Sequence, residues 1–97
     1  MGQPSLSTAA NGHLMLSIDS AQRERWASLQ KVLETALGYR REGDTIAGFD
    51  EGIAPDFVNG EIRIHAGWDN WSGHYLLADC VAGDEVLRQL HRQSTTP

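Results

Sequence analysis

The dipeptide Asn59-Gly60 directly precedes a stretch of alternating polar and apolar residues, and it constrains the fold more than any other feature of the sequence. A two-residue type I′ turn needs positive φ at both central positions, and Asn-Gly is a pair that adopts this conformation readily. We therefore predict an antiparallel hairpin around this turn. Its predicted pairs are Val58 with Glu61, Phe57 with Ile62, and Asp56 with Arg63.

A second two-residue turn, at Asp69-Asn70, would extend this hairpin into a three-stranded meander. Trp68 would then lie opposite Trp71, and His65 opposite His74. Because a one-residue slip exchanges the two faces of a strand, a clean separation of side chains favours this register. One face would carry Phe57, Ile62, Ile64, Ala66, Trp68, Trp71, Tyr75 and Leu77. The other face would carry Asp56, Glu61, Arg63, His65, Ser72, His74, Leu76, Ala78 and Cys80.

Two further strands are predicted outside the meander. Leu14, Leu16 and Ile18 alternate with less apolar residues, which is the period of a half-buried strand over residues 13–18. The stretch from Thr45 to Phe49 also favours a strand, although its glycine weakens it. The sequence leaves open how these two strands pair with the rest of the sheet.

Two helices are predicted from helical spacing and from their end signals. The first begins at Asp19 or Ser20, with Gln22 three residues after Asp19 in capping-box spacing, and ends at Gly38. It carries apolar residues at helical spacing on one side. The second helix begins at Gly83-Asp84, where the acidic residue suits the positive end of the helix dipole. The apolar residues of the two helices are Trp26, Leu29, Leu33, Ala36, Leu37, Val86, Leu87 and Leu90.

These elements predict an α+β fold, an antiparallel β-meander of 3–5 strands with two α-helices packed on one face. Residues 1–12 are small and polar, and we expect a flexible N-terminal arm there. Residues 13–93 are expected to form a single α+β domain, followed by a frayed tail at 94–97.

The charge of the chain is concentrated in its second half. The formal net charge is −5, and residues 42–87 hold ten acidic residues against Arg63 alone. Nucleic acids and anionic membranes are disfavoured as ligands, because both need a basic surface. An acidic surface favours a basic protein as partner, whereas its simplest alternative role is solubility.

The sequence also predicts a cellular location. Cys80 is the only cysteine and cannot form an internal disulfide, which favours a reducing compartment. There is no apolar run of 18 residues and no N-terminus that resembles a signal peptide. We therefore expect a cytoplasmic protein.

The segment around the second turn is the predicted partner-binding site. Tryptophan is enriched among the residues that dominate binding energy at protein interfaces, and acidic residues surround this pair of tryptophans. The alternative is that the two indoles close one end of the core. The candidate partner-binding residues are Trp68, Asp69, Asn70, Trp71, Asp50, Glu51 and Asp56.

His65 and His74 are the candidate metal ligands. If they lie directly opposite each other, their Cβ atoms are about 4.5–5.5 Å apart, close enough to share an ion. A zinc site needs further donors, and Cys80 lies about 20 Å along the strand from His74. The alternative is that both are surface histidines, and no cofactor is predicted.

Three hypotheses follow for function. The first is a non-enzymatic, small acidic protein-binding module, an inhibitor or immunity-type protein that neutralises a basic partner. Its size, charge and layout are similar to those of small bacterial immunity and adaptor proteins, an analogy without a shared motif. The second is a metal- or ligand-binding protein that uses His65 and His74. The third is a structural homodimer that pairs through an exposed strand edge.

Overall fold

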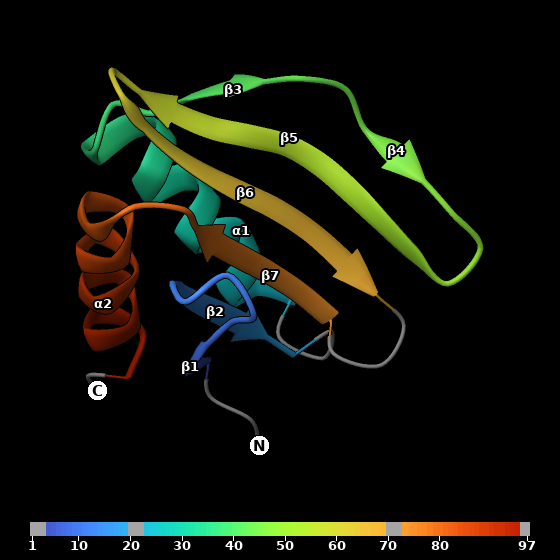
Figure 1. The fold of residues 1–97 in the computed structure, drawn as a ribbon, viewed down its shortest axis with the longest axis horizontal. Helices are drawn as coiled ribbons and strands as arrows, with labels where there is room; N and C mark the ends of the chain where they lie inside the picture. Colours follow the sequence, from blue (N-terminus) through green and yellow to red (C-terminus); the bar gives the residue numbers. More distant parts are fainter. Residues whose placement is uncertain (1–3, 20–22, 70–72, 96–97) are drawn as a thin grey trace.

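In the computed structural model, which describes residues 4–19, 23–69 and 73–95, the chain forms one α+β domain (Figure 1). A single sheet is built from seven strands, and all of its strand pairings are antiparallel. The strands are β1 Ser5–Thr8, β2 Leu14–Ile18, β3 Arg40–Glu42, β4 Ile46–Ala47, β5 Glu51–Asn59, β6 Ile62–Asp69 and β7 Gly73–Ala78. The helices are α1 Arg23–Lys31, its π-helical continuation η1 Val32–Ala36, and α2 Val81–Thr95.

The strand order is β1-β2-β7-β6-β5-β3. The short strand β4 pairs with the same edge of β5 as β3 does, but nearer the start of β5. The meander predicted from the sequence is therefore confirmed as β5-β6-β7, and the sheet extends it on both sides. The order also resolves the question that the sequence left open. The strand predicted at residues 13–18 lies next to β7, and the strand predicted at 45–49 shrinks to β4 at the far edge.

The N-terminal arm predicted for residues 1–12 contains a strand instead. β1 pairs with β2 without a break in register, from Ser5 opposite Ser17 to Thr8 opposite Leu14. Only Leu6 is apolar within this four-residue strand, so the pattern of its side chains does not distinguish it from a loop. At the other end, α2 runs to Thr95 and takes in part of the predicted tail at 94–97.

The first predicted turn is displaced by one residue. Asn59 pairs with Ile62, so the two turn residues are Gly60 and Glu61. Gly60 has φ of 60°, and no described residue other than glycine has positive φ. This is the pattern of a turn with glycine at its first central position, as in type II′, rather than type I′. Each residue of β5 near the turn pairs with a β6 residue two positions later than predicted, for example Phe57 with Ile64 rather than with Ile62. Because side chains alternate between faces, a shift of two leaves every side chain on its predicted face.

The second predicted register is wrong by three positions, and this exchanges the faces of β7. Asp69 does not begin a two-residue turn but ends β6 and pairs with Gly73. His65 therefore lies opposite Leu77, and Trp68 opposite His74. Asn70, Trp71 and Ser72 lie outside the described residues.

The exchange has a simple physical reason, because β7 has apolar side chains on both faces. The predicted register would bury Tyr75 and Leu77, whereas the observed register buries Leu76 and Ala78. Alternation within His74–Ala78 does not choose between these arrangements. The choice is made by packing against the helices, which the local sequence does not encode.

One hydrophobic core lies between the sheet and both helices, as predicted. The strand residues of the core occupy the same face of the sheet by register, and both helices cover that face; Val58, also buried, lies on the other face opposite Arg63. The opposite face is turned away from α1 and α2, and we call it the open face. The core consists of Leu16, Ile18, Trp26, Leu29, Leu33, Tyr39, Phe57, Ile64, Ala66, Leu76, Ala78, Leu87 and Leu90.

A specific side-chain contact fixes α1 to the sheet, and a local cap defines the start of α2. Trp26 of α1 stacks on His74 of β7, with ring centroids 4.6 Å apart and planes 7° apart. The start of α2 is capped by Cys80, whose Sγ accepts from the amide of Gly83 at 3.4 Å and whose carbonyl accepts from the amide of Asp84 at 3.0 Å. The helix thus begins at Val81, before the predicted Gly83. The predicted cap residues Ser20 and Gln22 lie outside the described residues.

Candidate functional site

The hairpin formed by β4 and β5 extends away from both helices, at the right of the view in Figure 1. The amide of Gly48 donates to the carbonyl of Glu51 at 2.7 Å, so Phe49 and Asp50 form the tip. The Phe49 side chain is 97 % exposed. A phenyl ring at the tip of a hairpin gains nothing from folding, so folding does not explain its presence there.

Two more large apolar side chains are exposed on the same hairpin. Ile46 and Ile53 face each other across the β4–β5 pair and are 63 % and 51 % exposed. The only other large apolar side chain with comparable exposure in the described residues is Val81 at the start of α2. Adjacent exposed apolar residues with a polar rim are typical of protein-binding surfaces.

A hollow of about 340 Å³ adjoins these isoleucines. The strand register places Tyr75, Glu51 and Asp69 on the open face together with Ile46 and Ile53. The open-face side of the hollow thus has apolar walls, the ring of Tyr75 and two carboxylates. Its lining consists of Ile46, Gly48, Glu51, Gly52, Ile53, Trp68, Asp69 and Tyr75.

Two glycines let aromatic rings lie flat across the sheet at this point. Tyr75 lies over Gly67, where an added methyl group would be 2.6 Å from the ring carbon Cζ and 2.7 Å from the carbonyl oxygen of Gly52. On the opposite face Trp68 lies over Gly52, where a methyl group would be 2.5 Å from the indole Nε1. The glycines therefore fix the position of Tyr75 in the hollow and that of Trp68 behind it.

The electrostatic potential of the hollow is negative. Glu51 and Asp69 are directly opposite each other in the β5–β6 pair. Burial raises the pKa of the Tyr75 hydroxyl, and the nearby carboxylates of Glu51 and Asp69 raise it further. Burial disfavours charge of either sign, so it is the two carboxylates, and not burial, that favour a cation here.

The structure brings together part of the partner-binding site predicted from the sequence. Glu51, Trp68 and Asp69 line the hollow, and Asp50 lies at the adjacent tip. The indole of Trp68, however, lies on the helix side of the sheet, so it does not serve as an exposed anchor on the open face. Asn70 and Trp71, also predicted to bind, lie outside the described residues.

Asp56, the remaining predicted binding residue, belongs to a separate strip of charged side chains. Its carboxylate accepts from Arg63 Nη1 at 2.7 Å and lies 3.1 Å from His65 Nδ1. Arg63 Nη2 also donates to Glu42 at 2.7 Å. Hydrogen bonds from Arg63 and then Arg40 hold the pKa of Glu42 below its usual value. This strip is internally paired, so Asp56 is part of the scaffold rather than of the candidate site.

The predicted metal site is not formed, because its two histidines lie on opposite faces of the sheet. His74 stacks on Trp26 on the helix side, whereas His65 lies on the open face. His65 Nε2 is 3.1 Å from Asp79, and its Nδ1 is 3.1 Å from Asp56. The imidazole thus lies between the two carboxylates and contacts one with each ring nitrogen. Within the described part of the chain, no three His, Cys, Asp or Glu side chains are grouped to hold a metal ion.

The residues that sequence reasoning missed are the apolar ones, Ile46, Phe49, Ile53 and Tyr75. The sequence places Ile46 and Phe49 in the predicted strand at 45–49 and Tyr75 on the predicted buried face of the meander, and it predicts no element or role for Ile53. A usable signal was present, because Gly48-Phe49-Asp50 places a phenylalanine among turn residues.

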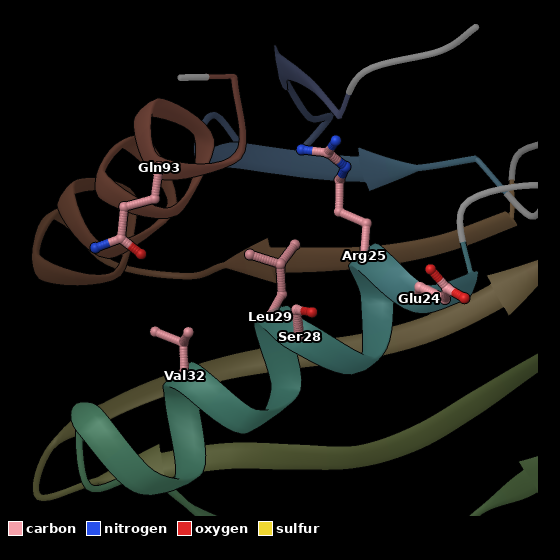
Figure 2. A pocket seen from close by; sticks show the side chains of 6 residues that line it. All are labelled: Glu24, Arg25, Ser28, Leu29, Val32 and Gln93. Carbon is pink, nitrogen blue, oxygen red and sulfur yellow. The ribbon is translucent and has the colours of Figure 1, made fainter. Parts of the chain in front are cut away.

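A second hollow, of about 350 Å³, lies between the two helices (Figure 2). The side chains of Leu29 in α1 and Val32 in η1 point toward the gap between the helices, and the side chain of Gln93 in α2 points toward it from the other side. Glu24 and Arg25 contribute opposite charges to its lining. This mixed lining does not select a class of ligand.

No family model, no curated protein and no solved structure matches this chain. None of the described helices is both long enough and apolar enough to cross a membrane.

Proposed function

We propose that this protein is a non-enzymatic binding module that holds a basic protein partner at the end of the β4–β5 hairpin. An inhibitor or immunity-type role, in which binding neutralises that partner, fits a small acidic domain of this kind. We call the surface the hairpin site. It comprises Ile46, Phe49, Asp50, Glu51, Ile53, Asp69 and Tyr75.

The observation that carries this proposal is the clustering of three exposed apolar side chains on one projecting hairpin. Full burial of a Phe or Ile side chain contributes about 1.5–3 kcal/mol. In the free protein Phe49 gains almost none of this, and Ile46 and Ile53 gain only part of it. A partner that covers them would gain it on binding, and a rigid aromatic anchor at the centre is typical of binding hot spots.

The charge around these side chains favours a basic partner. Residues 43–62 contain five acidic residues and no Lys, Arg or His. Carboxylates at the rim accelerate association with a basic surface and disfavour acidic competitors. The hollow beside Ile53 suits a lysine or arginine side chain, whose alkyl stem can pack on the apolar walls while its head meets Glu51 and Asp69.

Affinity capture from source cells tests the proposal. The bait proteins are wild type, the double variant Phe49→Ala/Ile53→Ser, and Val81→Ser as a matched control that removes an exposed apolar side chain elsewhere. We expect wild type and the control to recover the same basic protein, with recovery falling as salt is raised. The double variant should recover at least tenfold less.

Two results would contradict the proposal. One is equal recovery by all three baits, which would place binding away from the hairpin. The other is the absence of a specific partner for wild type even at low salt.

A further inference from the structure

The two edges of the sheet differ in how well they are protected against pairing with another chain. A free edge exposes unpaired backbone N–H and C=O groups, and natural sheets protect such edges with short strands, charges, prolines or bulges. The edge formed by β3, β4 and the outer side of β5 has all four. β3 consists of Arg40, Arg41 and Glu42, β4 has two residues, and β5 has Pro55 within a register shift between Ala54 and Phe57.

The opposite edge, β1, is also short, at four residues, but it has none of the other three features. Ser5–Thr8 carries no charge and no proline, and its pairing with β2 runs in unbroken register. Three of its four residues are exposed. Such an edge is a template for a further strand.

The hydrogen bonds of the β1–β2 hairpin show which backbone groups of β1 point away from β2. The amide of Ala9 donates to the carbonyl of His13 at 2.8 Å, so the backbone groups of Ala9 point toward β2. Because these groups alternate along a strand, those of Ser7 and Ser5 also point toward β2. The N–H and C=O groups of Leu6 and Thr8 therefore point outward.

We propose that β1 pairs antiparallel with β1 of a second copy of this chain, which joins the two sheets across a two-fold axis. The register that satisfies every outward group places Ser7 opposite Ser7 of the second copy. Leu6 of each chain then forms a hydrogen-bonded pair with Thr8 of the other. A shift to Leu6 opposite Leu6 would bring Pro4, which has no N–H, into the pairing.

The chemistry of β1 fits a second copy better than the basic partner of the hairpin site. The strand has no charge with which to select a charged partner, and uncharged serines oppose each other without repulsion. Leu6 packs at the margin of the core and is only half-buried. In the dimer it would lie diagonal to Leu6 of the second copy, so the two cores would meet beneath the shared sheet.

This inference does not depend on the proposed function. The hairpin site lies at the β4–β5 edge, which is the edge opposite β1. Pairing through β1 therefore leaves both hairpin sites uncovered, at the two ends of the joined sheet.

Light scattering across a concentration series measures the predicted association. We expect the molar mass of wild type to rise from 10.7 kDa toward about twice that value as concentration increases. Ser7→Lys would place two ammonium groups opposite each other and should shift the transition to at least tenfold higher concentration. Thr45→Lys makes the same charge change away from β1 and should leave the transition in place. A wild type that stays monomeric at millimolar concentration, or equal behaviour of both lysine variants, overturns the proposal.

Disulfide formation tests the register itself. In a Cys80→Ser background, Ser7→Cys should form a covalent dimer under mild oxidation, because paired cysteines need Cα atoms about 4.4–6.8 Å apart. Ser5→Cys is the matched control, since it lies on the same face but about 13 Å from its counterpart in this register. Cross-linking of Ser5→Cys alone, of both variants equally, or of neither contradicts the proposed pairing.

Discussion

Gly52 and Gly67 have a role here that composition alone does not reveal. Neither has the positive φ that often explains a glycine. Each instead leaves room for an aromatic ring from the neighbouring strand, Trp68 on one face and Tyr75 on the other. A glycine in a strand interior usually weakens the strand, and here the covering ring compensates by packing on the exposed backbone.

Gly67→Ala should lower the free energy of unfolding by about 1–3 kcal/mol, because its methyl group would overlap both the Tyr75 ring and the carbonyl of Gly52. Urea denaturation measures the change. Ser17→Ala is a suitable control, because Ser17 lies opposite Tyr75 in β2 and the substitution adds no atom beside the ring. An unchanged midpoint for Gly67→Ala would show that the ring does not lie over this glycine.

Phe49→Ala should leave the free energy of unfolding within about 0.5 kcal/mol of wild type, because the ring is 97 % exposed in the free protein. Thermal denaturation measures this directly. A clear drop in Tm would mean that Phe49 packs within its own chain, and the hairpin would then lose its role as a binding anchor.

At the scale of elements, Asp84 fixes the start of α2 to the start of β2. Its carboxylate accepts from the amide of Leu14 at 2.8 Å and lies 3.0 Å from His13 Nδ1. Burial alone would raise the pKa of Asp84, but the hydrogen bond from Leu14 and the contact with His13 outweigh it, so the pKa lies below its usual value. The contact joins residues 70 positions apart in the sequence.

A lowered pKa means that the ionised form of Asp84 stabilises the fold above the pKa of the unfolded chain, about 3.9. This contribution is lost as the pH falls through the lower pKa of the folded state. At pH 7 the substitution Asp84→Asn should therefore lower the free energy of unfolding by about 1–2 kcal/mol. The difference should begin to shrink below about pH 4, where the unfolded wild type takes up a proton, and should disappear once the pH falls below the lower pKa of the folded state.

Urea denaturation at pH 7 and pH 3 measures both values. Asp44→Asn provides the same charge change at an exposed loop position and should show little difference from wild type at either pH. A deficit in Asp84→Asn that persists unchanged at pH 3 would contradict this role for the carboxylate.

The elements differ in how far the sequence alone could predict them. The helix around Trp26 and Leu29 and the strand at Leu14–Ile18 followed from periodicity, because each has one apolar side. The faces of β5 and β6 also followed, although Gly60 rather than Asn59 begins the turn. β7 could not be placed, since its apolar residues alternate with other apolar residues and only packing against the helices selects its face.

The candidate site was predictable in its charges but not in its apolar part. Glu51 and Asp69 stood out in an acidic stretch, and the strand register brings them together. Whether Ile53 is buried or exposed depends on which side of the sheet the helices cover. That is a property of the assembled domain and not of the local sequence.

At the scale of the whole molecule, the sheet has one face that both helices cover and one open face. The proposed hairpin site lies on the open face at one edge of the sheet, and the proposed dimer contact lies at the other edge. The helices bury one side of every strand of the meander, so the hairpin site and the free edge of β1 lie outside the core. Substitutions at these two surfaces should therefore separate binding from folding.

The alignment of β6 with β7 decides which side chains belong to each face, and an NMR measurement of short interproton distances tests it directly. Nuclear Overhauser effects should connect the backbone protons of Trp68 with those of His74, and those of His65 with those of Leu77. Contacts between His65 and His74 would instead bring the two imidazoles to one face. In that case Tyr75 would leave the open face, and the hollow beside Ile53, which the proposed site needs for a basic side chain, would lose its aromatic wall.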